Sequence, residues 1–294
     1  MRDYKKVVTI LVLSGIALVT LLVIGINQAL HSSKREETKQ MLKSIVHSKE
    51  SKSQPQNSHQ FPSESEFVSQ FIASYVNYSS FDDYKNHLKP YVTVELGQAM
   101  KLDSEMPDFG SSTSSDMAIF HGDKHQYFAY ATQSLTNGLN MPMAVMIMVE
   151  KTKDSYQVTQ ICEPALRGVA VNYIDKWSDK ASIGIPVKTA EDKSALAFMR
   201  AYNNFGSLNN QKDNIRNLLT ADMQARLAVN SLGTDAPLES EINKLSLWKS
   251  EANQFAALVQ VNIAGEKTNQ VYQFELKKVD DNYLVKDFKQ ATRQ

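Results

Sequence analysis

The sequence predicts an α+β protein: an N-terminal transmembrane helix followed by two tandem modules, each a cone of helices laid on a curved antiparallel sheet. Three observations support this prediction. An uncharged apolar run lies near the N-terminus, a polar segment follows it, and a residue pattern then recurs at a spacing of 127. In each repeat, helical patterns come first and alternating strand patterns second, as is typical of α+β domains.

Composition limits the classes of function. The 294 residues suffice for about two domains. Acidic and basic residues balance at 32 each, which argues against a general nucleic-acid-binding surface. The only cysteine, Cys162, can form no intrachain disulfide, and we expect it to be a small buried apolar residue. Ordinary hydrophobic burial must therefore stabilise the folded part.

Residues 7–26, VVTILVLSGIALVTLLVIGI, carry no charge. As a helix they span about 30 Å, the thickness of the hydrocarbon core of a bilayer. The alternative is a cleaved signal peptide, but such apolar cores are usually shorter and end at a small-x-small site, which does not follow Ile26. The expected anchor positions are Val7, Leu11, Leu18, Leu22 and Ile26.

Basic residues on the two sides of the span nearly balance, so the charge rule indicates orientation only weakly. The dense cluster of Arg2, Lys5 and Lys6 favours a cytoplasmic N-terminus and an extracytoplasmic C-terminal part. We expect a tail at 1–6, a single-pass helix at 7–28 in the cell membrane and a polar stalk at 29–62.

An internal repeat is the most informative feature. Residues 71–100 align without gaps on 198–227, and residues 154–158 align on 281–285 at the same offset. A shared register over separate blocks indicates duplication. We expect a first domain at 63–177, a connection at 178–190 and a second domain at 191–290. The aromatic core positions that should recur are Phe71 and Phe198, Tyr75 and Tyr202, and Tyr156 and Tyr283.

Each copy should begin with an amphipathic helix, followed by a short helical segment near 83–88 or 213–218. A further helix should have Thr93 or Thr220 as its N-cap. The strands expected by alternation are 126–135, 143–149 and 156–162, then 241–248, 255–263, 270–278 and 283–288. The residues expected on the inward faces are Val145, Ile147 and Val149, then Tyr272, Phe274 and Leu276.

Four blocks carry a family resemblance: FIASYVNYSSFDDYKNHLKPYVT, YQVTQICEPAL, GIPVKTAED and YQFELKKVDDNYLVKDF. Together with the anchor, they resemble the TcpC-like conjugation proteins of Gram-positive bacteria, relatives of the inner-membrane assembly factor of type IV secretion systems. The resemblance implies two nuclear-transport-factor-like domains. It also implies a non-enzymatic scaffold of a DNA-transfer channel that contacts other channel proteins and itself. It implies no cofactor, and we expect no sequence-specific nucleic-acid binding.

Signs of chemistry are sparse. The run from His121 to His125 could offer metal ligands on alternate strand positions, but Gly122-Asp123 is more simply a turn, so we expect no metal. An enzyme on this fold would need a carboxylate and a tyrosine together inside the cone, and the residues available for that role are Asp116, Tyr127 and Tyr130. No motif places them together, so we expect no catalytic residues.

Two alternatives to a scaffold remain: a membrane-tethered module of the cell envelope that binds a ligand or peptide, and an extracytoplasmic enzyme. An open, polar-lined cone would favour either alternative, whereas a cone filled by Phe71, Tyr75 and Ile147 would favour the scaffold. Trp177 and Trp248 are possible interface anchors, with core packing as the other interpretation.

Overall fold

The computed structural model describes residues 63–105, 110–164, 171–172, 184–231, 237–250 and 253–290. The predicted tail, membrane span and stalk lie outside these residues. Among the described residues, no helix is long and apolar enough to cross a bilayer.

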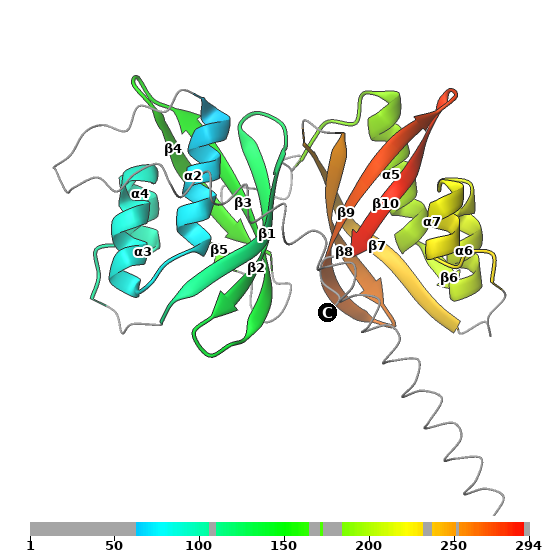
Figure 1. Ribbon diagram of the computed structural model, residues 1–294, viewed down its shortest axis with the longest axis horizontal. Coiled ribbons are helices and arrows are strands. Elements are labelled where there is room, and N and C mark those ends of the chain that lie inside the picture. Colours follow the sequence, from blue (N-terminus) through cyan, green and yellow to red (C-terminus); the bar gives the residue numbers. More distant parts are fainter. Residues whose placement is uncertain are drawn as a thin grey trace, which may run out of the picture. The chain divides into compact units, whose positions relative to one another are not determined.

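The first half of the described chain, from residue 63 to residue 172, has helices before strands (Figure 1). Its helices are α2 (Glu64–Val76), α3 (Phe81–Leu88), the 3₁₀ turn η1 (Lys89–Tyr91) and α4 (Val94–Ala99). Its strands are β1 (Ser112–His121), β2 (Gln126–Leu135), β3 (Asn140–Lys151), β4 (Tyr156–Glu163) and β5 (Val171–Asn172). The alternation predicted β2 to its last residue and β4 to within one. The strand prediction omitted β1, whose pattern a β-bulge between Ser115 and Ala118 interrupts.

The second half, from residue 184 to residue 290, also has helices before its long strands (Figure 1). Its helices are α5 (Ala190–Asn203), α6 (Leu208–Arg216) and α7 (Ala221–Arg226). Its strands are β6 (Phe205–Ser207), β7 (Pro237–Lys249), β8 (Gln254–Ile263), β9 (Glu266–Val279) and β10 (Asn282–Gln290). The second helix of each half begins earlier than predicted because a serine caps it: the Ser80 hydroxyl accepts from Asp83 N and the Ser207 hydroxyl from Asn210 N.

The predicted threonine caps are confirmed. Thr93 Oγ1 accepts from Leu96 N, and Thr220 Oγ1 accepts from Met223 N. Each threonine also donates its backbone N–H to a strand of its own half: Thr93 to Val158 O of β4 at 3.1 Å, and Thr220 to Val285 O of β10 at 3.0 Å. One local sequence signal therefore both starts a helix and ties it to the sheet.

Consecutive strands within each half pair in antiparallel fashion, and the two meanders join in one sheet of order β10-β9-β8-β7-β1-β2-β3-β4-β5, with β6 on β7. The link between the meanders is the pairing of His121 with Lys249. Among the residues described, helices before an antiparallel sheet in each half make the protein α+β, which is compatible with the nuclear-transport-factor-like fold that the resemblance implies.

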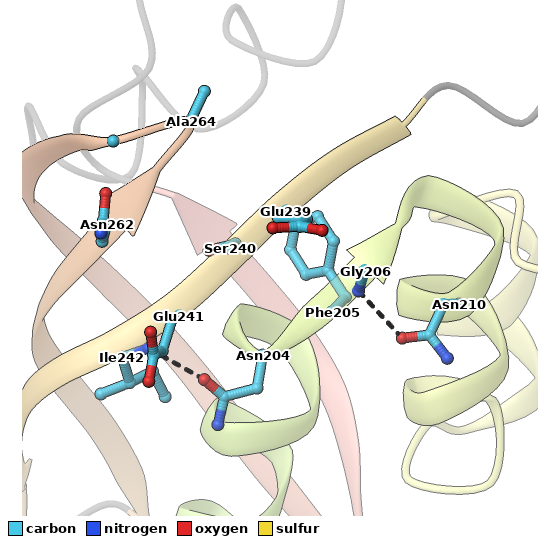
Figure 2. Close-up of a pocket in the computed structure, with 11 residues that line it drawn as sticks. Asn204, Phe205, Gly206, Asn210, Glu239, Ser240, Glu241, Ile242, Asn262 and Ala264 are labelled. Carbon is cyan, nitrogen blue, oxygen red and sulfur yellow. Dashed lines mark hydrogen bonds between the residues drawn. The ribbon is translucent and has the colours of Figure 1, made fainter.

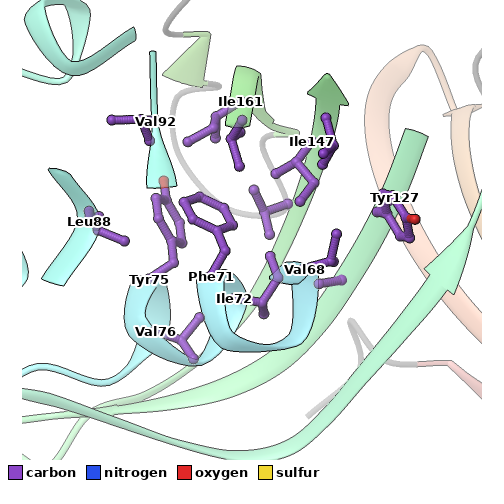
Figure 3. Close-up of a cluster of buried hydrophobic side chains, with 14 of the residues drawn as sticks. Val68, Phe71, Ile72, Tyr75, Val76, Leu88, Val92, Tyr127, Ile147 and Ile161 are labelled. Atoms are coloured by element: carbon purple, nitrogen blue, oxygen red, sulfur yellow. The ribbon is translucent and has the colours of Figure 1, made fainter. Parts of the chain in front are cut away.

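Each half has its own core between its helices and the inward face of its sheet. In the first half, Phe71, Ile72 and Ile147 are wholly buried (Figure 3). In the second half, Phe198 and Met199 pack against Tyr272 and other residues of the inward face of the sheet. All six residues expected on the inward faces lie in these two cores.

A third buried cluster joins the halves through the other faces of the sheets. Phe128 and Tyr130 of β2 pack there with Trp248 of β7, and the Phe128 and Trp248 rings stack at 5.6 Å. Strand β2 is therefore buried along its first six residues, on both faces. The alternation in the sequence had suggested only one buried face.

Candidate functional site

An open groove of about 700 Å³ lies in the second half, where α5 ends and β6 meets β7 (Figure 2). Its lining combines amide side chains, two carboxylates and backbone of the β8–β9 turn. The lining residues are Asn204, Phe205, Gly206, Asn210, Glu239, Ser240, Glu241, Ile242, Asn262, Ala264 and Gly265. The volume falls within the range of about 300–1,000 Å³ that is common for ligand sites.

Local hydrogen bonds fix one wall of the groove. Asn204, the C-cap of α5, accepts from Ile242 N at 2.9 Å through its Oδ1 atom. Asn210 accepts from Gly206 N at 3.2 Å (Figure 2). The first bond joins the end of α5 to β7, and the second joins β6 to the start of α6.

The opposite wall carries negative charge. Glu239 and Glu241 are both exposed, and neither forms an ion pair with another described residue. Asn262, paired with Glu241 across the β7–β8 ladder, has a buried Oδ1 atom that receives no hydrogen bond from the described residues. The groove therefore offers acceptors and negative charge, which favours a cationic hydrogen-bond donor and disfavours phosphate.

At the equivalent place in the first half, two hydrogen bonds join the strand ends. Ser111 N donates to Thr136 Oγ1 at 2.6 Å, and Thr136 N donates back to Ser111 O at 3.1 Å. The first two strands of each meander correspond at an offset of 128 residues, as Ser114 and Ile242 show. At that offset the counterpart of Ser111 is Glu239, and the counterpart of Thr136 is Ala264. Since an alanine side chain cannot hydrogen-bond, the bond from Ser111 N to Thr136 Oγ1 has no counterpart in the second half.

The interiors of both cones are filled. Phe71 and Ile147, which the sequence named as the residues that would fill the first cone, are 0% exposed, and Tyr75 is 4% exposed (Figure 3). In the second half Phe198 packs edge-on against Phe288 at 5.2 Å between ring centroids. Among the described parts of the chain, the groove thus lies outside the two cores.

One ionisable group enters the first core from its rim. The Tyr75 hydroxyl donates to Glu163 Oε1, and burial raises the pKa of the Glu163 carboxyl, although the hydrogen bond from Tyr75 partly offsets this shift. In the second half the counterpart of Glu163 is Gln290, whose amide donates to Gln270 Oε1 at 3.3 Å. Tyr272 donates there to Asn203 Oδ1 at 2.7 Å, so these residues form a neutral network.

The residues considered for an enzyme do not converge. Tyr127 belongs to the core of the first half, whereas Tyr130 lies in the cluster on the other face of the sheet. Asp116 is exposed on β1 with a φ of 54° at the β-bulge. The Tyr127 hydroxyl donates instead to Glu64 Oε1 at 2.8 Å, and burial together with this contact raises the pKa of Tyr127.

The two histidines of the 121–125 segment have different partners. His125 Nδ1 lies 2.8 Å from Glu64 Oε2, at the start of α2, while the His121 ring contacts the Tyr127 ring. Lys124 and His125 both have positive φ, as expected for the turn. Within the described ranges, no cluster of His, Cys, Asp and Glu residues has the geometry to hold a metal.

The two tryptophans differ in what can be said of them. Trp248 is wholly buried between the halves, and Trp177 lies outside the described residues.

The groove was not predicted from the sequence. The signal that could have revealed it was a departure from the repeat, because Ser111 and Thr136 become Glu239 and Ala264 in copies that otherwise keep the same caps.

No protein-family model matches the sequence, and the search of curated proteins found no match. Among solved structures, a protein described as "Ntf2 like protein involved in plasmid conjugation" aligns with 77% of this chain and 94% of its own length, at 15% identity and a TM-score of 0.26. At that score the likeness carries no weight in the proposals that follow.

Proposed function

We propose that this chain is a non-enzymatic, membrane-anchored scaffold of a conjugative DNA-transfer channel of the type IV secretion class. Its two α+β modules would lie outside the cytoplasm and act through protein–protein contacts, including contacts with further copies of the chain. The anchor would be the apolar run at 7–26. The balanced charge of the chain supports a role without sequence-specific binding of the transferred DNA.

The observation that carries this proposal is the filling of both cones. Enzymes and small-molecule binders need a concave site that admits their ligand. Phe71 and Phe198 occupy the corresponding space here and are wholly buried. The sequence resemblance to the TcpC-like proteins supports the connection with conjugation, and the polar composition of residues 29–62 supports a role at a distance from the membrane.

The experiment is transfer of a conjugative plasmid from cells that carry variants of this chain. Deleting residues 7–26 should abolish transfer and the crosslinks to other membrane proteins that a lysine-reactive reagent captures in intact cells. Replacing the same residues with an unrelated apolar span of equal length should restore both, because the anchor would serve only as a tether. Full transfer by the deletion variant would contradict the proposal.

A second candidate function is a membrane-tethered module that binds a peptide or ligand of the cell envelope. The groove between β6 and β7 favours it, because its volume and polar lining suit a ligand. The crosslinking experiment separates the two candidates. A scaffold should capture the same set of channel proteins only in cells that carry the conjugation genes, whereas an envelope-binding module should capture its partner in their absence.

A further inference from the structure

The groove of the second half is a place where two otherwise similar copies diverge. One contact recurs in the wall around Asn204, since Asn77 accepts from Ser114 N at 2.7 Å as Asn204 does from Ile242 N. The other residues of this wall differ, because the first half has Tyr78, Ser79 and Asp83 where the second has Phe205, Gly206 and Asn210. The opposite wall differs as well, because the Ser111–Thr136 contact of the first half is replaced by Glu239 and Ala264. When two copies share the same backbone contacts, a binding site can arise in one copy through changes in the side chains that line the groove.

The sign of the charge selects the class of ligand. Glu239 and Glu241 face solvent at the groove without a basic partner among the described residues. Lys267 pairs with Asn262 across β8 and β9, and Lys244 pairs with Gln260 across β7 and β8, but neither lysine lines the groove. Two carboxylates that lie two residues apart on β7 repel nucleic acid and acidic lipid surfaces and attract cations.

The volume of the groove and the buried Oδ1 atom of Asn262 further limit the class of ligand. A single metal ion needs several ligands within about 2.6 Å, which a groove of about 700 Å³ with two carboxylates does not supply. The amide of Asn262 holds an unpaired Oδ1 atom beside Glu241. Rotation of that amide about its broad terminal torsion presents the oxygen to a donor in the groove. An ammonium or guanidinium group on an extended side chain meets these requirements.

We propose that this groove is a docking site for a lysine- or arginine-bearing segment of a partner protein. This inference rests on the scaffold role proposed above, and it adds the place of contact and the chemistry of the partner. The basic side chain lies between Glu239 and Glu241 and donates to Asn262, while the segment runs along β6. Because both carboxylates are exposed, solvent and salt screen the attraction, and binding should weaken as the salt concentration rises.

The test is binding of a fluorescein-labelled decapeptide of alternating lysine and serine to the full-length protein in neutral detergent micelles. A peptide with glutamate in place of lysine is the reference. We expect the basic peptide to bind and the acidic one not to bind. The double variant Glu239→Gln/Glu241→Gln should weaken binding about tenfold at low salt, the sum of two exposed charge contacts.

A matched control keeps the change in net charge but moves it away from the groove. Glu105 and Glu150 are exposed and form no ion pair with another described residue, so Glu105→Gln/Glu150→Gln should leave the affinity within about twofold of the unmodified protein. A third variant blocks the groove sterically. An added Cβ at Gly206 meets no atom within 4 Å, and the first half has Ser79 at this position, so Gly206→Trp should fold and abolish binding.

Equal weakening in the control variant, or unchanged binding in Gly206→Trp, would overturn the docking site. So would binding of the acidic peptide at the same affinity. Each of these outcomes leaves the anchored-scaffold proposal intact if the crosslinks to membrane proteins persist in cells. Loss of those crosslinks from the unmodified protein would instead count against the scaffold, whatever the peptide does.

Discussion

The two halves of the molecule share their frame and differ in what they leave open to solvent. In both halves an asparagine, Asn77 or Asn204, caps the end of the first helix and accepts a hydrogen bond from the first long strand of that half. In both, a lysine also donates to the backbone carbonyl of a serine 19 residues later: Lys85 to Ser104 and Lys212 to Ser231. The bridge of Val92 to Val158 recurs as Leu219 to Val285. Backbone geometry has thus been retained, whereas the rim of each cone and the edge of the groove have changed.

The difference teaches where each copy can vary without loss of the fold. The shared contacts satisfy backbone groups at helix ends and strand edges, whose loss is costly. The residues that differ, Ser111 and Glu239 or Glu163 and Gln290, take no part in those shared contacts. Function is therefore most naturally sought at the positions where the copies disagree.

The largest effect should come from the recurring aromatic residues. Phe71→Ala and Phe198→Ala should each lower the free energy of unfolding by about 3–5 kcal/mol, because both side chains are wholly buried and leave a cavity. Urea denaturation of the full-length protein measures this. Val94→Ala, at a position 73% exposed, should change the free energy by less than about 0.5 kcal/mol. A small effect in only one half would show that the two cores are not equivalent.

The next effect should arise at the connection between the halves. A Cβ at Gly184 would lie 2.3 Å from Leu247 O, and the residue has a φ of +102°. Gly184→Ala should therefore lower the free energy of unfolding by more than about 2 kcal/mol through strain and the broken contact of the Leu247 backbone. Gly138→Ala is the matched control, because its φ is +76° but nothing lies within 4 Å, and it should lose about 1 kcal/mol. Equal losses would show that the clash is relieved.

The serine caps should give a smaller and symmetric effect. Ser80→Ala and Ser207→Ala each leave a helix N–H without its acceptor and should lower the free energy of unfolding by about 1 kcal/mol. Since the sites lie in different halves, the losses in the double variant should add to within about 0.5 kcal/mol. Thermal denaturation of the three variants measures this, and a strongly non-additive result would show that the helices α3 and α6 are coupled.

The smallest effect concerns Glu163, a partly buried carboxylate whose counterpart in the second half is Gln290. Because burial raises the pKa of Glu163, the folded state binds its proton more tightly than the unfolded state. The contribution of Glu163 to stability is therefore greatest below the usual glutamate pKa and is lost as pH rises through the raised value. Glu163→Gln should match the unmodified protein in acid and exceed it at neutral pH, by no more than the 0.5–1.5 kcal/mol or so of one hydrogen bond. Urea denaturation over this pH range gives the difference, and a difference that does not change with pH would contradict the assignment.

Much of the fold could be predicted from the sequence, because the signals are local or periodic. Thr93 and Thr220 cap their helices as expected, and β2 ends where the Asn137-Gly138 turn predicted. The inward residues Val145 and Tyr272 lie in the two cores. The site could not be predicted in the same way, because Asn204 and Glu241 are 37 residues apart in sequence and neither belongs to a motif.

The sequence by itself determined that helices precede the main strands in each half, that the pattern recurs, and which residues lie on each inward face. These follow from helix caps, from the strand period of two and from the repeat spacing, each of which acts over a few residues or copies a local pattern. The tertiary structure alone decided that β2 is buried on both faces, because Trp248 of the other half covers Phe128. It also decided that Ser111 and Thr136 join the strand ends of the first half while a groove lies at Glu239 and Ala264 of the second, because that outcome depends on contacts between strand ends far apart in the chain.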